Sequence, residues 1–571
     1  MKNYQLKTGY PSNDKSHLFG VSKKKINPKV VPLCMLSMFK RINFGHMDET
    51  AIYTRGKKYS KKQLLNDSLK FAEYLADLIA KRREAQHSYR KEFFSPKIAI
   101  ATPSCYEGII ATLGANAIGV GVIMISDSCD DSQLIEELRL HEPIGLIAYG
   151  KNAEWANEIQ SNTQSYFFLQ KIWIANTLDD ISEEIFGFSK NILEGKTKNR
   201  RLTLRSVFNF SRDKNEPAIF LKSSGYMTGE SKSLPFSNQA ICAALKYTLN
   251  STGIKPHNQE IKRVLCTTPY YLASGWAPMF LNIIAGNETV ITGTDNQEIA
   301  DYYKYQPSCI YATPIILEKF IMKTPITENL NYLKAFYCGG AALSEKKYKR
   351  GINFLREHKS NAEIRNNYGL SEALCIGTTT ENIPRLPKTV GKLYLGPKWL
   401  IVDEDLNEVK YNEPGELLIS SKTLCLGYFD NEKATRKSFV DVYGDVYFRT
   451  GDIVSLHESG YVSFLDRKHR FFSPKNSQKK VSCNEIEQGL ENCECIKDAA
   501  VIAVKNGSEK RAKAFVVLRH DDGETNYKKI IRKELKNILL DYQMPSEISI
   551  IDELPIAESG KINYSLLETD Y

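Results

Sequence analysis

A short segment of small hydroxyl residues with two glycines and a lysine has the composition of an anion-binding loop. Residues 222–232 read KSSGYMTGESK and follow an apolar run, 219–221, that predicts the end of a strand. Glycines let the backbone approach an anion, successive N–H groups form a concave nest, and Ser, Thr and Lys add donors and charge. The spacing differs from the G-x4-G-K-[ST] phosphate loop. Taken alone, the segment is also compatible with an ordinary loop.

Four further short motifs carry residue types that suit a nucleotide and its metal ion. They read CGGAAL at 338–343, NYGLSE at 367–372, YFRTGD at 447–452 and LPIAESGK at 554–561. A flat ring such as that of Tyr368 suits a flat base, and the carboxylate oxygens of Glu372 suit a hard cation. Each motif has a plainer explanation when taken alone, because a Gly-Gly pair after a strand is usually a turn and a lone lysine is usually a surface residue.

In this order, the loop and the four motifs resemble those of the adenylate-forming superfamily: acyl- and aryl-CoA synthetases, nonribosomal peptide adenylation domains and beetle luciferases. The resemblance covers most of the chain. The family loop reads T-S-G-T-T-G-x-P-K-G, and Ser231 stands here in place of its proline. The resemblance implies a nucleotide site formed by Ser223, Ser224, Gly225, Thr228, Gly229, Lys232, Gly339, Gly340, Ala341, Asn367, Tyr368, Gly369, Ser371, Asp452 and Arg467.

The resemblance also implies a reaction, in which ATP converts a carboxylic acid to an acyl-adenylate and releases pyrophosphate. Tyr368 would stack on adenine, Asp452 would accept hydrogen bonds from the ribose hydroxyls, and Glu372 would hold Mg²⁺. Because a carboxylate is already ionised at pH 7, catalysis needs positioning and charge neutralisation and no general base. The implied catalytic residues are Lys561, Arg467 and Thr228.

One segment lies where the family builds a wall of the acid pocket. It reads PYYLASGW at 269–276 and would contribute Tyr271, Leu272, Gly275 and Trp276. Amino-acid-activating members carry an aspartate at the position of Leu272, and a leucine cannot balance a buried ammonium group. We therefore expect an aryl, fatty or other acid that lacks an α-amino group. The alternative is that this segment is simply core.

The resemblance further implies an acyl acceptor, the pantetheine thiol of coenzyme A or of a separate acyl carrier protein. A small C-terminal domain would rotate about a hinge at about 466–470 to admit the thiol. Asp466 stands where the family has a glycine, and His469 replaces the hinge aspartate. Residues 472–481 also lack the family's glycine, a departure that concerns thiol transfer rather than adenylation. Two alternatives stay open: a nucleotide-binding pseudoenzyme without turnover, and an amino-acid-adenylating enzyme.

The apolar pattern predicts elements that hold these motifs in a large α/β domain. Leu65, Leu69, Ala72, Ala76 and Ile79 share one face of a helix. Short apolar strands at 97–102, 120–126 and 144–150 alternate with helices at 106–118 and 132–141. This alternation predicts a parallel sheet covered by helices on both faces.

The remaining elements predict two smaller parts. Strands at 415–420, 446–449 and 461–465 indicate a small β-rich part of the large domain. Residues 467–480 are basic and polar and predict a linker. A helix at 484–492, strands at 498–505 and 512–519 and a helix at 526–541 predict a small α+β domain. We therefore expect a large N-terminal domain over 1–465 and a small mobile C-terminal domain over 466–571.

Composition places the chain among ordinary globular proteins. It has 571 residues, of which 42% are hydrophobic and 25% charged, and this excludes collagen-like and disordered classes. The net charge of +10 is concentrated in clusters that predict solvated faces or contacts with anionic partners, without a nucleic-acid-binding pattern. The 12 cysteines show no metal-binding spacing and indicate a reducing compartment. Apolar runs too short to span a bilayer and a polar N-terminal segment predict a cytoplasmic location.

Overall fold

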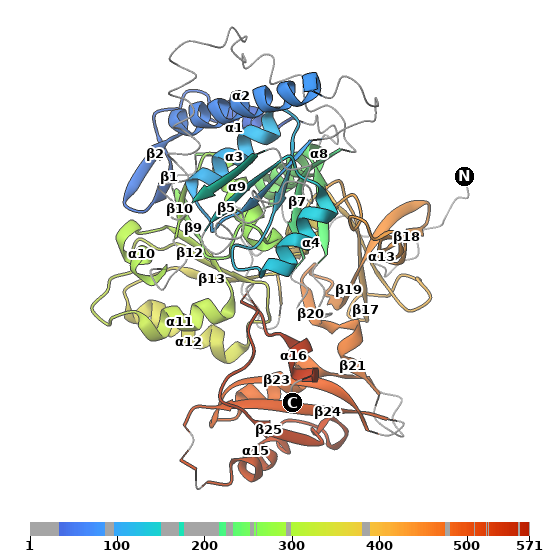
Figure 1. Cartoon of the computed structure of the whole chain (residues 1–571). Helices are drawn as coiled ribbons and strands as arrows, with labels where there is room; N and C mark the ends of the chain where they lie inside the picture. Colours follow the sequence, from blue (N-terminus) through green and yellow to red (C-terminus); the bar gives the residue numbers. More distant parts are fainter. Residues whose placement is uncertain are drawn as a thin grey trace.

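The structure is a computed structural model with a large part and a small C-terminal part (Figure 1). It describes residues 33–85, 96–149, 171–175, 216–223, 232–251, 256–257, 260–292, 298–379, 389–473, 480–506, 509–520, 522–523, 525–557 and 560–569. The small part lies at the bottom of Figure 1, below the β-rich portion and the helices α11 (Pro314–Lys323) and α12 (Glu345–Glu357).

The first sheet of the large part has six strands in the order β6-β5-β3-β4-β7-β8. Its strands are β6 (Lys171–Ala175), β5 (Gly145–Tyr149), β3 (Lys97–Ala101), β4 (Gly121–Met124), β7 (Pro217–Lys222) and β8 (Ser233–Ser237). All neighbours are parallel except β7 and β8, which form an antiparallel pair around the predicted anion loop. Helices α3 (Tyr106–Ala117) and α4 (Asp131–His141) lie between successive strands in the chain.

The second sheet has seven strands in the order β13-β12-β11-β9-β10-β1-β2. They are β13 (Glu363–Asn367), β12 (Ala335–Gly339), β11 (Cys309–Ala312), β9 (Arg263–Cys266), β10 (Glu288–Ile291), β1 (Thr50–Thr54) and β2 (Lys57–Ser60). The first six, from β13 to β1, are parallel to one another, and β2 is antiparallel to β1. Their carboxyl ends therefore meet at one edge, where ligands of such sheets bind.

Helices cover both faces of this second sheet. One large core joins the two sheets through α1 (Met35–Ile42), α2 (Lys61–Ala85), α3, α8 (Asn238–Ser251) and α9 (Ala273–Ala285). A second core, which contains Leu317, Phe320 and Phe354, lies under α10 (Glu298–Tyr305), α11 (Pro314–Lys323) and α12 (Glu345–Glu357). Burial of these apolar faces holds the helices against the sheet and so fixes the positions of the carboxyl ends of its parallel strands.

The β-rich portion and the small part complete the fold. The former is a sheet of β16 (Lys398–Val402), β17 (Pro414–Ser420), β19 (Asp445–Leu456), β18 (Phe439–Val442) and β20 (Val462–Arg467), with α13 (Glu432–Ser438) beside it. The small part has a sheet of β23 (Ile496–Asn506), β24 (Glu509–Leu518) and β25 (Glu547–Ile550), with α14 (Cys483–Asn492), α15 (Tyr527–Leu535) and α16 (Tyr564–Thr569). Its core is separate and begins at Phe472.

The expected α/β class, with a β-rich portion and a small α+β C-terminal part, is confirmed. The linker predicted over 467–480 is wrong in its first half. Arg467 ends β20, a 3-10 turn η3 covers Lys468–Arg470, and β21 (Phe471–Phe472) pairs with β22 (Val481–Ser482). Residues 474–479 lie outside the described part. The domain limits at 465 and 466 stay a prediction.

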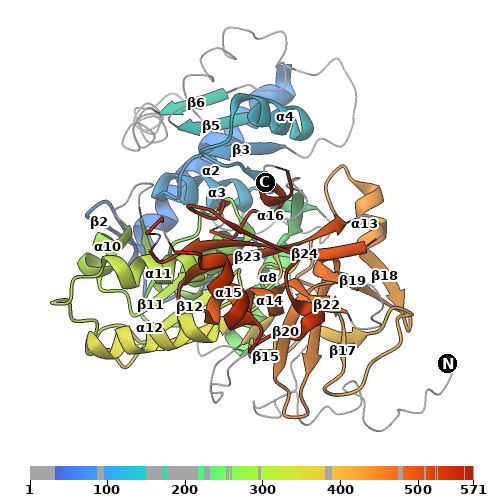
Figure 2. The ribbon, with the colours of Figure 1, turned by 90° about the horizontal axis from the view of Figure 1, so that it is seen from below.

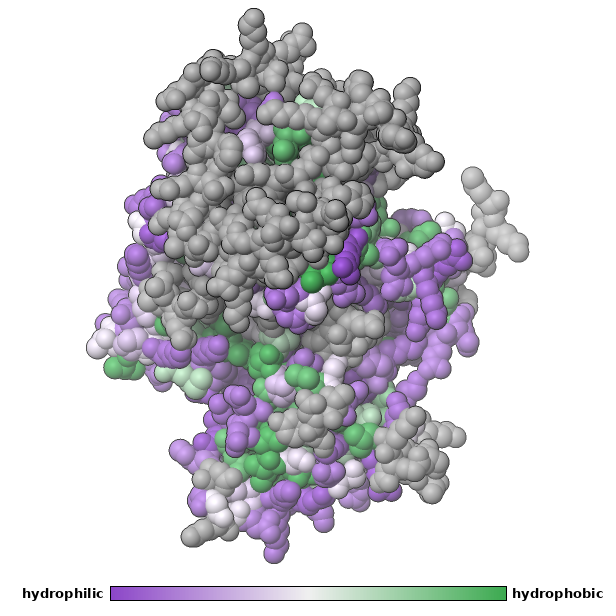
Figure 3. All heavy atoms as spheres, in the orientation of Figure 1, coloured by the Kyte–Doolittle hydropathy of each residue, from purple (hydrophilic) through white to green (hydrophobic). Residues whose placement is uncertain are grey.

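The face of the molecule seen in Figure 3 has a mostly polar surface where it is described. Most of the coloured residues in Figure 3 are hydrophilic (purple), and smaller groups of apolar residues (green) lie between them. Among the described helices, none combines the length and the apolar character needed to cross a membrane.

Candidate active site

A cavity of about 150 Å³ lies at the edge where β11, β12 and β13 end. The α9 helix forms its opposite wall, and Lys561 of the small part reaches into it. Its lining residues are Thr248, Thr268, Ser274, Ala277, Pro278, Leu281, Asn282, Tyr311, Ala312, Thr313, Tyr337, Cys338, Gly339, Gly340, Asn367, Tyr368, Gly369, Ser371, Leu374, Cys375, Ile376, Thr378, Tyr394 and Lys561.

Seven residues that the sequence analysis selected line this cavity together: Gly339, Gly340, Asn367, Tyr368, Gly369, Ser371 and Lys561. Gly339 and Asn367 are register partners at the ends of β12 and β13, so the parallel sheet itself brings the two motifs together. Gly340 has a φ of 83°, and a Cβ there would lie 3.2 Å from Cε of Lys561. A glycine at this position therefore leaves room for the lysine stem.

Asp452 links the cavity wall to the β-rich portion. Its carboxylate is fully buried, accepts a hydrogen bond of 2.5 Å from the Tyr368 hydroxyl, and lies 2.8 Å from Nε of Arg467. Asp452 and Arg467 are also register partners on β19 and β20. Burial raises the pKa of Asp452, and the Arg467 charge and the Tyr368 hydrogen bond oppose that rise. Three residues from separate motifs thus form one cluster around the buried Asp452 carboxylate.

Glu372 and Lys232 meet through a tyrosine that the sequence analysis did not select. The Tyr428 hydroxyl donates to Glu372 at 3.1 Å, and Nζ of Lys232 lies 4.5 Å above the Tyr428 ring. Glu372 is half-buried, and its carboxylate oxygens are hard ligands. With the Lys232 ammonium group on the same tyrosine, this arrangement suits a magnesium ion bound to phosphates.

The ends of the predicted anion loop are held together. Ser223 and Lys232 exchange two hydrogen bonds of 2.9 Å, one from the backbone N–H of Ser223 and one to its hydroxyl. Ser224, Gly225, Thr228 and Gly229 lie outside the described residues. Ala341 follows the cavity edge but is not among the described lining residues.

Family profiles agree with this arrangement of motifs. The profile of the AMP-binding enzyme family matches residues 39–429, and that of the AMP-binding enzyme C-terminal domain matches residues 485–561. The chain belongs to the AMP-binding enzyme family.

Relatives of this chain in the AMP-binding family include two ligases and a synthase that are 26 to 28% identical to it. Peroxisomal OPC-8:0-CoA ligase 1 of Arabidopsis thaliana is 28% identical over 359 residues, 61% of this chain and 63% of that ligase. Gramicidin S synthase 2 of Brevibacillus brevis is 26% identical over 66% of this chain and 8% of its own length. The D-alanine--D-alanyl carrier protein ligase of Streptococcus agalactiae is 27% identical over 42% of this chain and 48% of its own. The chain thus spans less than two thirds of these relatives.

Solved structures share the fold over nearly the whole chain. The anthranilate CoA ligase AuaEII superposes with a TM-score of 0.77 and 18% identity, covering 95% of this chain and 98% of its own. ATP-bound MatB from Rhodopseudomonas palustris gives a TM-score of 0.76 and 18% identity, covering 94% and 99%.

The predicted acid-pocket residues lie outside the lining of this cavity, and their role in binding the acid stays a prediction. Tyr271, Leu272 and Trp276 are buried in the core, and Trp276 stacks on Phe280. A Cβ at Gly275 would lie 2.1 Å from the Pro269 carbonyl oxygen, so this glycine permits close packing. None of the four lines the cavity.

On this side the cavity is lined by one face of α9, the helix that contains Gly275 and Trp276. Ser274, Ala277, Pro278, Leu281 and Asn282 follow the i, i+3, i+4, i+7, i+8 spacing of one helical face, a signal that the sequence already carried. The backbone of Tyr271 has another use, because its carbonyl accepts the N–H of Lys222 at 3.3 Å and so fixes the start of the anion loop.

The segment around the predicted hinge is tied to both parts. Asp466 is 1% exposed and accepts hydrogen bonds of 2.8 Å from the Ser482 hydroxyl and the Asn484 N–H, at the start of α14. On the other side, Lys468 pairs with Glu416 of β17 at 3.0 Å. Burial lowers the pKa of His469. Asp466, which stands where the family has a glycine, thus anchors α14, the first helix of the small part.

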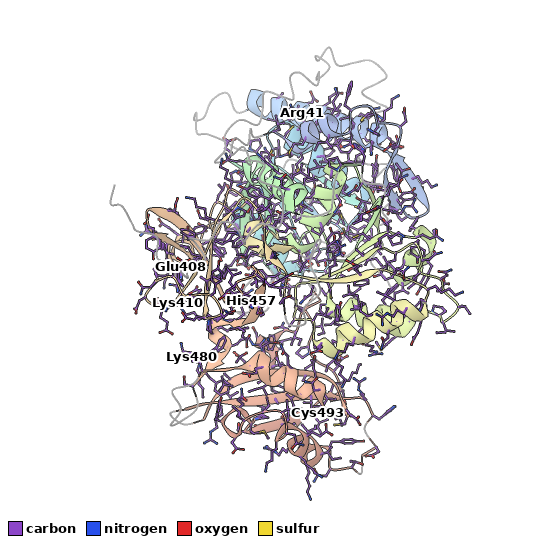
Figure 4. The ribbon with its side chains drawn as sticks, turned by 180° about the vertical axis from the view of Figure 1, so that it is seen from behind. Arg41, Glu408, Lys410, His457, Lys480 and Cys493 are labelled. Atoms are coloured by element: carbon purple, nitrogen blue, oxygen red, sulfur yellow. The ribbon has the colours of Figure 1, made fainter. Side chains whose placement is uncertain are left out.

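Two lysines of α12 also hold the small part in place. Nζ of Lys346 donates to the carbonyls of Glu491 and Cys493 at 2.8 and 3.1 Å, at the end of α14. Nζ of Lys347 lies 2.9 Å from Glu491 and 3.0 Å from Asp498. Figure 2 shows α14 and α15 in front of the large part, and Figure 4 shows Cys493 in the small part and Lys480 at the junction. These contacts accompany the arrangement in which Lys561 lies in the cavity.

Proposed function

We propose that the protein uses ATP to activate a carboxylic acid as its acyl-adenylate and then transfers the acyl group to a pantetheine thiol. The observation that carries the proposal is the meeting of Lys561, from the small part, with the nucleotide motifs of the large part in one cavity. Membership of the AMP-binding enzyme family supports it.

In the first step, a carboxylate oxygen attacks the α-phosphorus of ATP, and the bond to the β-phosphate breaks as pyrophosphate leaves with the electron pair. Both reactants are anions, so the chain's contribution is positioning and positive charge. Lys561 supplies an ammonium group beside Gly340 in the cavity. Asp452 accepts from the ribose hydroxyls, and Arg467 holds that carboxylate in position. A magnesium ion held by Glu372 would neutralise phosphate charge.

The cavity's charge supports an acid without an α-amino group. Among the described lining residues, Lys561 alone carries a charge, so these residues offer no carboxylate to balance an ammonium group. The walls include Ala277, Pro278 and Leu281 of α9, with the polar Ser274 and Asn282 on the same face, and the stacked rings of Tyr311 and Tyr337, whose centroids are 4.7 Å apart. An aryl or aliphatic monocarboxylic acid suits these walls.

The acceptor is the thiol of coenzyme A or of the phosphopantetheine of a separate carrier protein. The thiol attacks the acyl carbon, AMP leaves, and the thiol proton passes to solvent. Relatives whose names include a CoA ligase and a carrier protein ligase support both acceptors.

An ATP–pyrophosphate exchange screen over a panel of acids tests the proposal. We expect exchange with a monocarboxylic acid that has no charged group besides its carboxylate, and a loss of at least 100-fold in Lys561→Ala. Lys528→Ala, at an exposed position at the start of α15, is the matched control and keeps full activity. Absence of exchange with every acid would leave a nucleotide-binding pseudoenzyme.

A further inference from the structure

Thr313 occupies the N-cap position just before α11, but its side chain does not cap the helix. Threonine at a helix N-cap normally accepts a hydrogen bond from a first-turn N–H group. Here the Thr313 side chain makes no such bond, although its carbonyl accepts the N–H of Leu317 at 3.0 Å. Thr313 is 5% exposed, and its hydroxyl has no hydrogen-bond partner among the described residues. A buried hydroxyl without a partner is costly and unusual, so its orientation needs an explanation.

The position of Thr313 explains its orientation, because Thr313 and Lys561 line the same cavity. A Cβ on Gly560 would lie 2.8 Å from the Thr313 hydroxyl oxygen, and a Cβ on Gly340 would lie 3.8 Å from its methyl carbon. The same point at Gly340 is 3.2 Å from Cε of Lys561. Thr313 therefore packs against the two glycines beside the Lys561 stem, and rotation about Cα–Cβ can bring its hydroxyl to the place that the methyl group now occupies.

The surroundings favour an anion at this corner. The N-terminal end of α11 carries partial positive charge, and Lys561 adds an ammonium group. No carboxylate is among the described residues that line the cavity, so the hydroxyl proton has no anionic acceptor from them. Hydrogen bonds to charged acceptors are the stronger class, so an oxyanion would compensate the buried donor best.

We propose that Thr313 is a further binding residue for the reacting oxyanion, donating its hydroxyl proton to the acid carboxylate or to an α-phosphate oxygen beside Lys561. The inference rests on the proposed adenylation. The bond orients and stabilises the anion, and no proton is transferred. Both candidate acceptors are oxyanions, and steady-state kinetics separate them.

The test compares Thr313→Val, which keeps the shape and removes the hydroxyl, with Thr313→Ser, which keeps the hydroxyl. We expect Thr313→Val to lower kcat/KM of pyrophosphate exchange about 10- to 100-fold. This is the loss expected when one hydrogen bond to a charged acceptor is removed. Thr313→Ser should stay within about threefold of the parent. A raised KM for the acid assigns the carboxylate, a raised KM for ATP assigns the α-phosphate, and a fall in kcat alone assigns a contact made in the transition state.

Thr324→Val is the matched control, because it removes a hydroxyl at the other end of α11, where Thr324 bonds Phe320 and Tyr303. Thr313→Ala serves as the hydroxyl-free variant should Thr313→Val not fold. Parent-like kcat and KM values in the hydroxyl-free variant would overturn the role of Thr313 while leaving adenylation intact. Absence of exchange in the parent protein with every acid would refute both proposals.

Discussion

Lys347 offers a test of how the small part is held over the cavity. Its ammonium group lies between Glu491 and Asp498 at 2.9 and 3.0 Å, and its side chain is 17% exposed. Burial alone would lower the pKa of Lys347, but the two carboxylates outweigh it and raise the pKa above its ordinary value. Lys347 is therefore charged and pairs two segments of the small part with one helix of the large part.

The magnitude follows from this half-buried geometry. Exposed ion pairs contribute about 0–1 kcal/mol, and breaking a buried pair costs about 3–5 kcal/mol. For Lys347→Met we expect an intermediate loss of about 1–3 kcal/mol, a shift of about 5- to 150-fold in the equilibrium between this arrangement and others. Lys346 still holds the end of α14, so the small part is loosened and not released.

The assay separates the two half-reactions. We expect Lys347→Met to slow ATP–pyrophosphate exchange, which needs Lys561 in the cavity, and not to slow transfer from preformed acyl-adenylate to the thiol. Lys349→Met is the matched control, because Lys349 is 71% exposed and pairs with Glu345 of its own helix at 2.7 Å. Equal losses in both half-reactions, or no loss in either, would refute the reasoning.

Three further predictions concern the site and its support. Asp452→Asn should weaken ATP binding at least tenfold by calorimetry, because the ribose loses a charged acceptor; an unchanged Kd would contradict that contact. Glu372→Gln should raise the Mg²⁺ concentration for half-maximal exchange about tenfold, whereas an unchanged value would remove Glu372 as the metal ligand. Burial, with the Lys222 and Lys97 charges, lowers the pKa of His141 to about 3. This group binds fewer protons in the folded state, so stability should fall as pH drops from about 6.5 towards 3, by at most about 1.4 kcal/mol per pH unit. Urea unfolding should show that slope reduced in His141→Leu, and equal slopes in the two proteins would argue against it.

Short motifs and strand ends were predictable from the sequence for a physical reason. A residue such as Asn367 or Gly339 follows a parallel strand, and parallel strands end at one edge, so their meeting required no knowledge of the rest of the fold. The order of the motifs also anticipated that Tyr368 and Asp452 lie together.

Other parts of the site depend on packing that the sequence order does not express. The face of α9 that lines the cavity depends on how Trp276 packs in the core, which the segment 269–276 alone did not indicate. The Tyr428 contact to Glu372 joins segments 56 positions apart that share no motif. The Thr313 hydroxyl lacks a hydrogen-bond partner among the described residues, and this depends on neighbours in space that the sequence order does not indicate.

The Asp466 anchor has a consequence for movement of the small part. Asp466 is fixed in the large part by the pairing of β20 with β19, yet its carboxylate holds the start of α14. A swing at residues 468–470 must break these bonds at its outset, and they re-form only on return. We therefore expect the small part to occupy discrete orientations and not to rotate freely. Leaving the orientation seen here should cross a free-energy barrier, because the Asp466 hydrogen bonds must break first.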